Sequence, residues 1–146
     1  MKKNEKDGFT LIEIMLVVII IGILVAMVLP RLVGRSEQAR MSAARADINS
    51  NIALALDMYE LDNGIYPTTE QGLNALKTKP SSSPVPPNWN GPYLKKTPLD
   101  PWGKPYIYTS PGTHTKDYDL ASWGGDGVEG GNDDVSNWQD SQDNNS

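Results

Sequence analysis

Hydrophobic residues are concentrated in one stretch near the start of the chain. Residues 9–29 form an almost uninterrupted apolar run with a single charge, Glu13. As an α-helix the run would reach about 31 Å, which matches the hydrocarbon thickness of a bilayer, so the sequence predicts a transmembrane helix. The run is longer than the apolar part of a secretory signal peptide, and Leu29-Pro30-Arg31 is a poor cleavage site. We therefore expect the segment to stay with the protein.

Residues 31–63 predict a continuing amphipathic helix. Apolar residues recur there at steps of three and four, which is typical of a helix that packs one face on a domain. Pro30 and Gly34 indicate a kink or local melting near the start, and Asn63-Gly64 is a typical helix stop. The residues of the predicted packing face are Met41, Ala44, Ile48, Ile52, Ala55, Leu56 and Tyr59.

A short helix and a long irregular loop are expected next. Thr68 and Gln71 have the spacing of a capping box, which predicts a helix that ends at about Lys77. Residues 79–92 are rich in proline and serine, so they predict a loop with little regular structure.

The last part of the chain predicts a small antiparallel sheet. Residues 104–109 and 117–122 are rich in tyrosine and alternate in character, and turn residues at 110–113 separate them. This pattern predicts a β-hairpin, so the fold class is α+β: a long N-terminal helix packed on a small sheet. Residues 139–146 predict a flexible tail.

Charge and composition exclude several classes of function. The net charge is −5, and from Asp117 onward there are eight acidic residues and no lysine or arginine. This part would repel phosphates, so we expect no nucleic-acid partner. The chain has no cysteine, which removes disulfides and thiolate sites. The one histidine, His114, lies in a turn, and no phosphate-binding loop or nucleophile motif is present, so we do not expect an enzyme.

Glu13 is an acid within the apolar run. An acid in a membrane segment is costly unless it is paired, so it usually marks function, although a place near the interface would reduce that cost. The sequence Gly8-Phe9-Thr10-Leu11-Ile12-Glu13, after a leader with three lysines, resembles the prepilin-type signal of type IV pilins and type II secretion pseudopilins.

This resemblance implies processing by a prepilin peptidase. Cleavage is expected between Gly8 and Phe9, followed by N-methylation of Phe9. Residues 1–8 are then a cleaved leader, 9–29 a transmembrane and polymerisation helix, and 30–138 a periplasmic globular domain. Cleavage leaves a cationic amine, which Glu13 of a neighbouring subunit can neutralise in a low-dielectric setting.

A cluster of acids lies near the C-terminus. Asp126, Asp133 and Asp134 stand among glycines within residues 122–138. Carboxylates and turn carbonyls are the oxygen ligands that calcium prefers, although the spacing is not that of an EF-hand. Spacing alone leaves a solvated acidic turn as the alternative.

Several segments resemble the major pseudopilins of type II secretion, and the likeness runs over residues 8–138, with 79–92 the weakest part. It implies a bound calcium ion with side-chain ligands from the three aspartates and backbone carbonyl ligands from Trp123, Val128 and Gly131. The segments that carry the likeness are Asp57-Met58-Tyr59, Tyr66 to Leu73, Asp100-Pro101-Trp102-Gly103, Ser110-Pro111-Gly112 and Asn137-Trp138.

The resemblance also implies a function. Such a chain is the major subunit of a pseudopilus, a helical homopolymer that drives export of folded proteins across the outer membrane. Implied partners are further copies of the chain, the prepilin peptidase, minor pseudopilins, the inner-membrane assembly platform and the membrane itself.

Two alternatives share part of this pattern. A major pilin of a type IV pilus has the same N-terminal signal, but many such pilins carry a C-terminal disulfide and this chain has no cysteine. A monomeric membrane-tethered module would not explain a processed Phe9 beside Glu13.

Four tryptophans could form a carbohydrate-binding face, but we expect core and loop-closing roles: Trp89, Trp102, Trp123 and Trp138.

Overall fold

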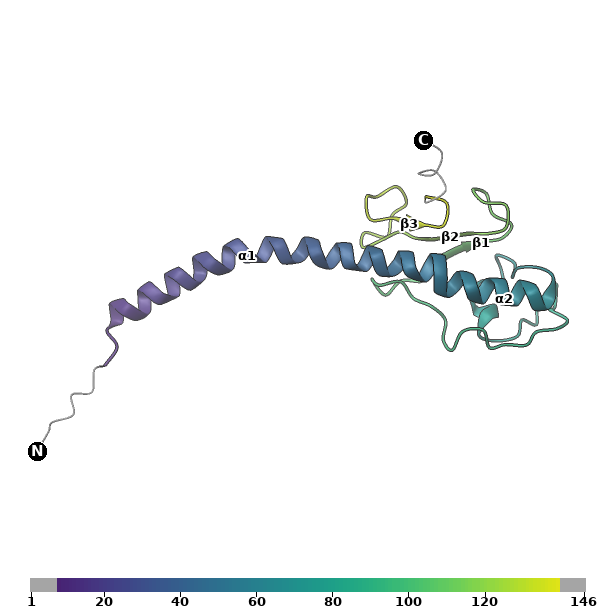
Figure 1. Cartoon of the computed structure of the whole chain (residues 1–146), viewed down its shortest axis with the longest axis horizontal. Helices are drawn as coiled ribbons and strands as arrows, with labels where there is room; N and C mark the ends of the chain where they lie inside the picture. Colours follow the sequence, from purple (N-terminus) through teal and green to yellow (C-terminus); the bar gives the residue numbers. More distant parts are fainter. Residues whose placement is uncertain (1–7, 140–146) are drawn as a thin grey trace, which may run out of the picture. The chain divides into compact units, whose positions relative to one another are not determined.

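The computed structural model describes residues 8–139, so nearly all of the predicted tail and of the predicted leader lies outside it, as do the side chains of residues 28–33. The chain divides into two compact units, Met1–Gln38 and Ala39–Ser146. The elements, in chain order, are α1 (Leu11–Ala46), the π-helix η1 (Asp47–Ile52), α2 (Ala53–Asn63), the 3₁₀-helix η2 (Leu73–Leu76), β1 (Ile107–Thr109), β2 (Asp119–Ser122) and β3 (Val135–Ser136) (Figure 1).

The first unit holds most of the long helix α1. Thr10 precedes the helix, and its Oγ1 accepts a hydrogen bond from the backbone N–H of Glu13 at 3.3 Å, which is the usual N-cap contact. Large apolar side chains from Phe9 to Met27 are 46–82% exposed in the single chain. A surface this apolar requires a partner outside the chain.

The structure bears on two expectations about α1. Of the kink or local melting expected at Pro30 and Gly34, local melting does not occur, because the backbone stays helical through both residues; an irregular turn falls further on, at η1. The sequence predicts that residues 9–29 cross a membrane, but the described part of the chain contains no helix that is long and apolar enough to do so.

The second unit is built around the helical segment that runs from the end of α1 to α2. The predicted packing face is confirmed, because Ile48, Ile52, Leu56 and Tyr59 are at most 1% exposed. A π-helix widens one turn, and the buried face continues across it at a spacing of four residues. The predicted stop is also confirmed: Gly64 has a φ of 77° and donates its N–H to Glu60 O at 2.7 Å.

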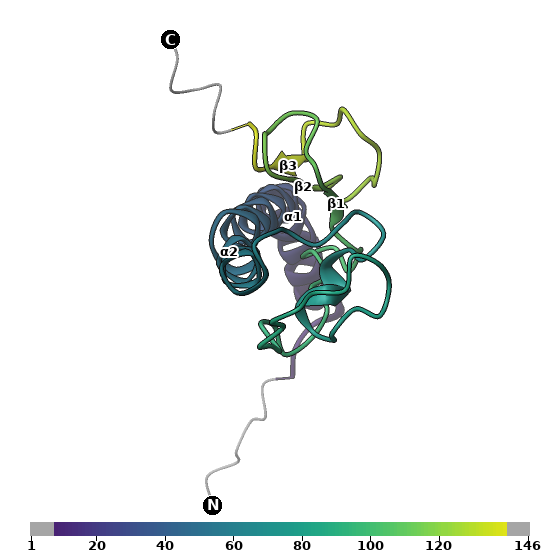
Figure 2. The same ribbon diagram turned by 90° about the vertical axis from the view of Figure 1, so that its right-hand side faces the viewer.

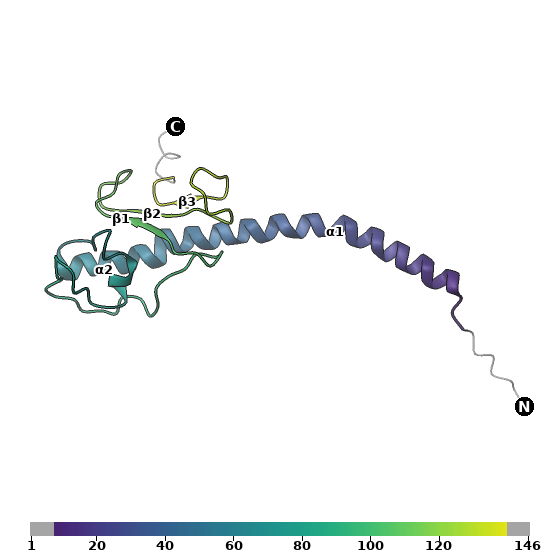
Figure 3. The ribbon, with the colours of Figure 1, turned by 180° about the vertical axis from the view of Figure 1, so that it is seen from behind.

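The sheet has three antiparallel strands in the order β1-β2-β3. The predicted hairpin is confirmed as β1 and β2, with Ile107 opposite Ala121, although both strands are shorter than predicted. The third strand, β3, was not predicted; it pairs with β2. The strands lie along one side of the helix, as Figures 2 and 3 show, and Tyr108, Leu120 and Val135 enter the helix-facing core.

The segment after α2 closes the rest of the core. The capping box is confirmed, because Thr68 N donates to Gln71 Oε1 at 3.1 Å and Gln71 N donates to Thr68 Oγ1 at 3.3 Å. The helix that follows is one 3₁₀ turn, Leu73–Leu76, which ends just short of Lys77. Residues 79–92 form no helix or strand, and the Gln71 amide holds this loop by donating to Ser82 O at 3.1 Å.

A pair of leucines on α2 tests this packing. Leu56 is fully buried and Leu54 is 62% exposed. We expect Leu56→Ala to lower the free energy of unfolding by about 2–5 kcal/mol, because it leaves a cavity in the core. The matched change Leu54→Ala should stay within about 0.5 kcal/mol of wild type. Denaturant unfolding measures both, and equal losses would contradict the packing.

Candidate functional site

The acidic loop of residues 123–134 connects β2 to β3. The pairing of Ser122 with Val135 closes the base of the loop. The chain therefore leaves the sheet at Trp123 and returns at Asp134 on adjacent strands, and the loop rises from the sheet on the side away from the helix (Figures 1 and 2). A two-residue strand thus brings the two ends of the predicted metal loop together.

The three predicted aspartates meet in space. Asp126, Asp133 and Asp134 each offer a carboxylate oxygen, and these oxygens lie within 4.8 Å of one another. Asp126 is exposed and the other two are half-buried. Three negative charges this close repel one another strongly unless a cation lies among them.

Backbone N–H groups of the loop orient these carboxylates. Asp133 Oδ2 accepts from Gly125 N at 2.6 Å, Asp134 Oδ2 accepts from Gly130 N at 2.6 Å, and Asp126 Oδ1 accepts from Val128 N at 2.9 Å. Each side chain is thus fixed through one of its two oxygens. The other oxygen of each is left to serve a different partner.

One of these remaining oxygens has no partner among the described residues. Asp134 Oδ1 is buried and has no hydrogen-bond partner among residues 8–139. A buried polar atom without a partner costs about 1–3 kcal/mol, and more when the group is charged. A cation bound by the cluster would remove that cost. The donor set, three carboxylates with hard oxygens, fits calcium.

Gly131 lines the cluster. A Cβ at this position would lie 2.7 Å from Asp133 Oδ1 and 3.0 Å from Asp126 Oδ2, so a side chain would press on both carboxylates. The carbonyl ligands expected from Trp123, Val128 and Gly131 stay predictions. The carbonyl of Trp123 accepts a hydrogen bond from Gly127 N at 2.9 Å, and Val128 is an exposed residue.

A buried carboxylate that sequence reasoning missed supports the start of the loop. Asp100 is 5% exposed, and its Oδ2 accepts the hydroxyl of Ser122 at 2.6 Å. Its Oδ1 accepts the backbone N–H of Trp102 and of Lys104, at 3.0 and 2.8 Å. Ser122 in turn accepts Gly124 N at 3.3 Å. The signal was present as an Asp before Pro-Trp-Gly, a typical turn sequence.

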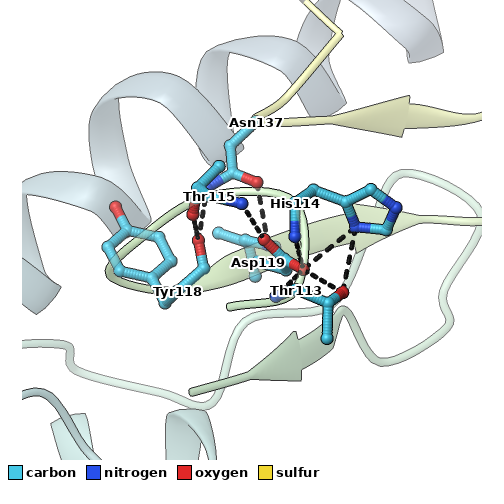
Figure 4. A network of polar contacts seen from close by, with 7 residues as sticks. Thr113, His114, Thr115, Tyr118, Asp119 and Asn137 are labelled. Carbon is cyan, nitrogen blue, oxygen red and sulfur yellow. Dashed lines mark hydrogen bonds and ion pairs between the residues drawn. The ribbon is translucent and has the colours of Figure 1, made fainter. Parts of the chain in front are cut away.

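Asp119 is a second missed carboxylate, and it organises the turn before β2. Its carboxylate accepts the backbone N–H groups of Thr113, His114 and Thr115 at 2.7–2.9 Å, and the Thr113 hydroxyl at 2.8 Å (Figure 4). Burial acts to raise the pKa of Asp119, but the hydrogen bonds from His114, Thr115 and Thr113 outweigh it and hold the pKa well below its usual range.

His114 and Trp138 have structural roles. The His114 ring is stacked on Trp138 with centroids 4.2 Å apart, and its Nδ1 lies 3.0 Å from Asp119 Oδ2. Just after β3, the Asn137 side chain binds the backbone at the start of β2. Its Oδ1 accepts the N–H of Leu120 at 3.0 Å, and its Nδ2 donates to Tyr118 O at 2.9 Å (Figure 4). These contacts account for the histidine without catalysis.

Two of the four tryptophans, Trp89 and Trp102, have the expected core and loop-closing contacts. Trp89 Nε1 donates to Ala75 O at 2.9 Å, and Trp89 packs against the core. Trp102 also packs there, and its Nε1 faces the Cα of Gly125 in the acidic loop.

The N-terminal residues of interest lie at the start of α1. Gly8 and Phe9 precede the helix and are exposed, and Glu13 lies in its first turn and is exposed. An acid in this position is favoured by the helix macrodipole, which is a local role that the sequence reasoning missed. The expected pairing of Glu13 with Phe9 joins two subunits, so one chain does not test it.

Comparisons with known proteins agree with the fold. Residues 31–138 match the family described as "Type II secretion system (T2SS), protein G", and residues 3–29 match the "Prokaryotic N-terminal methylation motif". The chain is 54% identical over 142 residues to type II secretion system core protein G of Pseudomonas aeruginosa, covering 94% of this chain and 99% of that protein.

Two further relatives come from Escherichia coli. Core protein G of strain K12 is 48% identical over 138 residues, which is 92% of each chain. The crystal structure of the major pseudopilin of the type 2 secretion system of enterohaemorrhagic E. coli superposes with a TM-score of 0.66 at 42% identity, covering 75% of this chain and 96% of that chain.

The chain therefore belongs to the family of type II secretion system protein G, the major pseudopilins of that system. The family consists of structural subunits and not of enzymes, which confirms the expectation from the sequence. Membership also decides between a secretion pseudopilin and a type IV pilus pilin, in favour of the pseudopilin.

The Asp119 network makes a pH-dependent prediction. The folded-state pKa of Asp119 is depressed, so its contribution to stability is full above its unfolded-state pKa of about 3.9 and is lost as the pH falls below that value. We expect Asp119→Asn to lower the free energy of unfolding at pH 7 by about 1–3 kcal/mol. The difference from wild type should shrink as the pH falls below about 4. Thermal unfolding across pH 3–7 measures this; a constant difference would contradict it.

Proposed function

We propose that the chain polymerises through its N-terminal helix into a periplasmic pseudopilus that drives export of folded proteins across the outer membrane. Prepilin peptidase would first remove residues 1–8 and methylate Phe9. Before assembly the chain would be held in the inner membrane with residues 30–138 in the periplasm. Minor pseudopilins and the inner-membrane assembly platform would be its partners during fibre growth.

The apolar surface of the helix supports assembly. Every large apolar side chain from Phe9 to Met27 is about half exposed or more in the single chain. Transfer of apolar surface out of water is favourable by about 25 cal/mol per Å², so these side chains favour either lipid or the helices of other subunits. The outer face of α2 adds Leu54, Met58 and Leu61, which are also exposed.

A charge pair would set the register between subunits. After cleavage, Phe9 carries a cationic amine and Glu13 of a neighbour carries the complementary charge. Away from water each charge is costly alone, and pairing reduces the cost only in one stagger of the two helices. The exposure of both residues leaves them available to a neighbouring chain.

We also propose that the acidic loop binds one calcium ion. The observation that supports it most directly is the buried Asp134 Oδ1, which has no hydrogen-bond partner in the described part of the chain and belongs to a carboxylate clustered with two others. Asp126, Asp133 and Asp134 would supply side-chain oxygens, and Trp123, Val128 and Gly131 would supply carbonyl oxygens.

The ion would supply positive charge that cancels the repulsion among the three aspartates. The loop residues then keep the turn that their amides already favour, and the β2–β3 pair stays closed at its base. Metal binding would therefore add to the stability of the folded domain, since an unfolded loop holds no such site.

Two matched substitutions test the calcium site. With calcium at 100 times its Kd, wild type should gain about 2.7 kcal/mol of stability over the same protein in chelator. Asp134→Asn should abolish this gain, because it removes a ligand charge and keeps the shape. Glu129→Gln, in an exposed acid of the same loop, should keep it. Thermal unfolding with and without calcium gives the answer. A gain that survives in Asp134→Asn would refute the site.

The N-terminal pair has its own test. In Glu13→Gln we expect normal cleavage and methylation, which mass spectrometry of the mature N-terminus reports. Fibre yield should fall at least about tenfold, because an unpaired buried charge costs about 3–5 kcal/mol. Glu70→Gln, in an exposed turn of the second unit, should leave fibres unchanged. Normal fibre yield from Glu13→Gln would contradict the proposed pairing.

A further inference from the structure

Lys104 places a positive charge against the backbone of the acidic loop. Its Nζ donates to Gly125 O at 2.9 Å and to Gly124 O at 3.2 Å. The ammonium also lies beside the bare Cα of Gly127, where an added Cβ would be 2.6 Å from Nζ. The side chain thus contacts three residues of the loop from a segment 20 residues earlier in the chain.

The backbone of Lys104 is held by two hydrogen bonds to Asp100, which restricts the positions that its side chain can reach. Lys104 N donates to the buried Asp100 Oδ1 at 2.8 Å, and Lys104 O accepts from Asp100 N at 2.8 Å. The other oxygen of Asp100 is bonded to Ser122, the last residue of β2. Lys104 and the start of the acidic loop are therefore tied to the same buried carboxylate.

The loop turn lies between this cation and an anion. The carbonyls of Gly124 and Gly125 face the Lys104 ammonium, and the N–H groups of Gly125 and Asp126 face Asp133 Oδ2, at 2.6 and 3.4 Å. The two peptide dipoles are thus aligned between opposite charges. Hydrogen bonds with a charged partner are roughly twice as strong as neutral ones, so this arrangement favours one conformation of a glycine-rich turn.

We propose that Lys104 is a positioning residue that holds the Gly124–Gly125 turn in its metal-binding shape before calcium arrives, an inference that rests on the calcium site proposed above. The ammonium bonds to loop carbonyls and leaves the carboxylates to the ion. It thereby reduces the ordering that calcium itself must impose. The apparent Kd of an ion equals its intrinsic Kd divided by the fraction of loops already in the binding shape.

A surface lysine without this role predicts the opposite result. Its positive charge would only repel a divalent cation, so removing it would tighten calcium binding. Loss of a positioning lysine weakens binding, because fewer loops have the binding shape. The sign of the change in calcium affinity therefore separates the two roles.

The first measurement is made without metal. Amide hydrogen exchange of the full chain in detergent and chelator reports on the N–H groups of Gly125 and Gly127, which are both hydrogen-bonded in the loop. In Lys104→Met we expect both to exchange at least about tenfold faster than in wild type. The β1–β2 amides should keep their protection, which shows that the sheet is folded.

The second measurement is calorimetric titration with calcium chloride. We expect Lys104→Met to raise the calcium Kd about threefold to tenfold. Lys104→Arg keeps a cation with several donors and should restore most of the affinity. The matched control Lys79→Met removes the same charge from an exposed position in the 79–92 loop and should leave Kd unchanged.

The proposal is overturned if Lys104→Met leaves loop exchange unchanged in chelator, or if it lowers the calcium Kd. Failure of the calcium site itself gives a different result. A wild-type chain that does not bind calcium contradicts the proposed metal function, while the exchange rates in chelator, measured without the ion, still decide whether Lys104 orders the loop.

Discussion

Repulsion among three clustered aspartates is the constraint on which the acidic loop depends. Asp126, Asp133 and Asp134 bring like charges within a few ångströms of one another, where unpaired carboxylates are strongly destabilising. The chain offsets part of this with loop N–H groups, each of which holds one carboxylate oxygen. It leaves one buried oxygen, Asp134 Oδ1, without a hydrogen-bond partner in the part of the chain that the structure describes. A bound cation would complete this arrangement, which is the ground for our proposal of a metal centre in place of a solvated acidic turn.

The loop is supported by elements far away in the sequence. The short strand β3 closes it at the base, and Asp100 ties the end of β2 to the segment that carries Lys104. At the start of β2, Asp119 accepts hydrogen bonds from the turn before the strand, and Asn137 accepts the backbone N–H of Leu120. Order in the loop is therefore shared with the sheet, and the sheet packs on the helix.

The sequence predicted the parts of the fold that repeat a pattern. Spacings of three and four residues located the buried helix face, a capping-box spacing located the turn before η2, and alternation located the β1–β2 hairpin. β3 was missed because two residues are too few for any period. The irregular turn at η1 was missed because a π-helix keeps the buried spacing on either side of it. Pro30 and Gly34 suggested a kink or local melting, and of these two the continuous helix α1 excludes melting.

The candidate site was predicted by charge and resemblance, and its supporting residues were not. Three aspartates among glycines were enough to predict the carboxylate cluster, because they share one loop. Asp100 and Lys104 have partners about 20 residues away in the chain, and the partners of Asp119 are backbone groups of a turn, so only the fold reveals these contacts. By sequence Asp119 counts with the acidic C-terminal part, but its carboxylate accepts backbone N–H groups of the turn at residues 113–115.

The most direct test of the metal centre is a crystal structure of the mature globular domain grown with calcium. The account predicts one ion with six to eight oxygen ligands at about 2.3–2.6 Å, including oxygens of Asp126, Asp133 and Asp134. Asp134 Oδ1 should be among them. A loop that keeps this shape with no ion among the three aspartates, or an ion bound elsewhere, would contradict it.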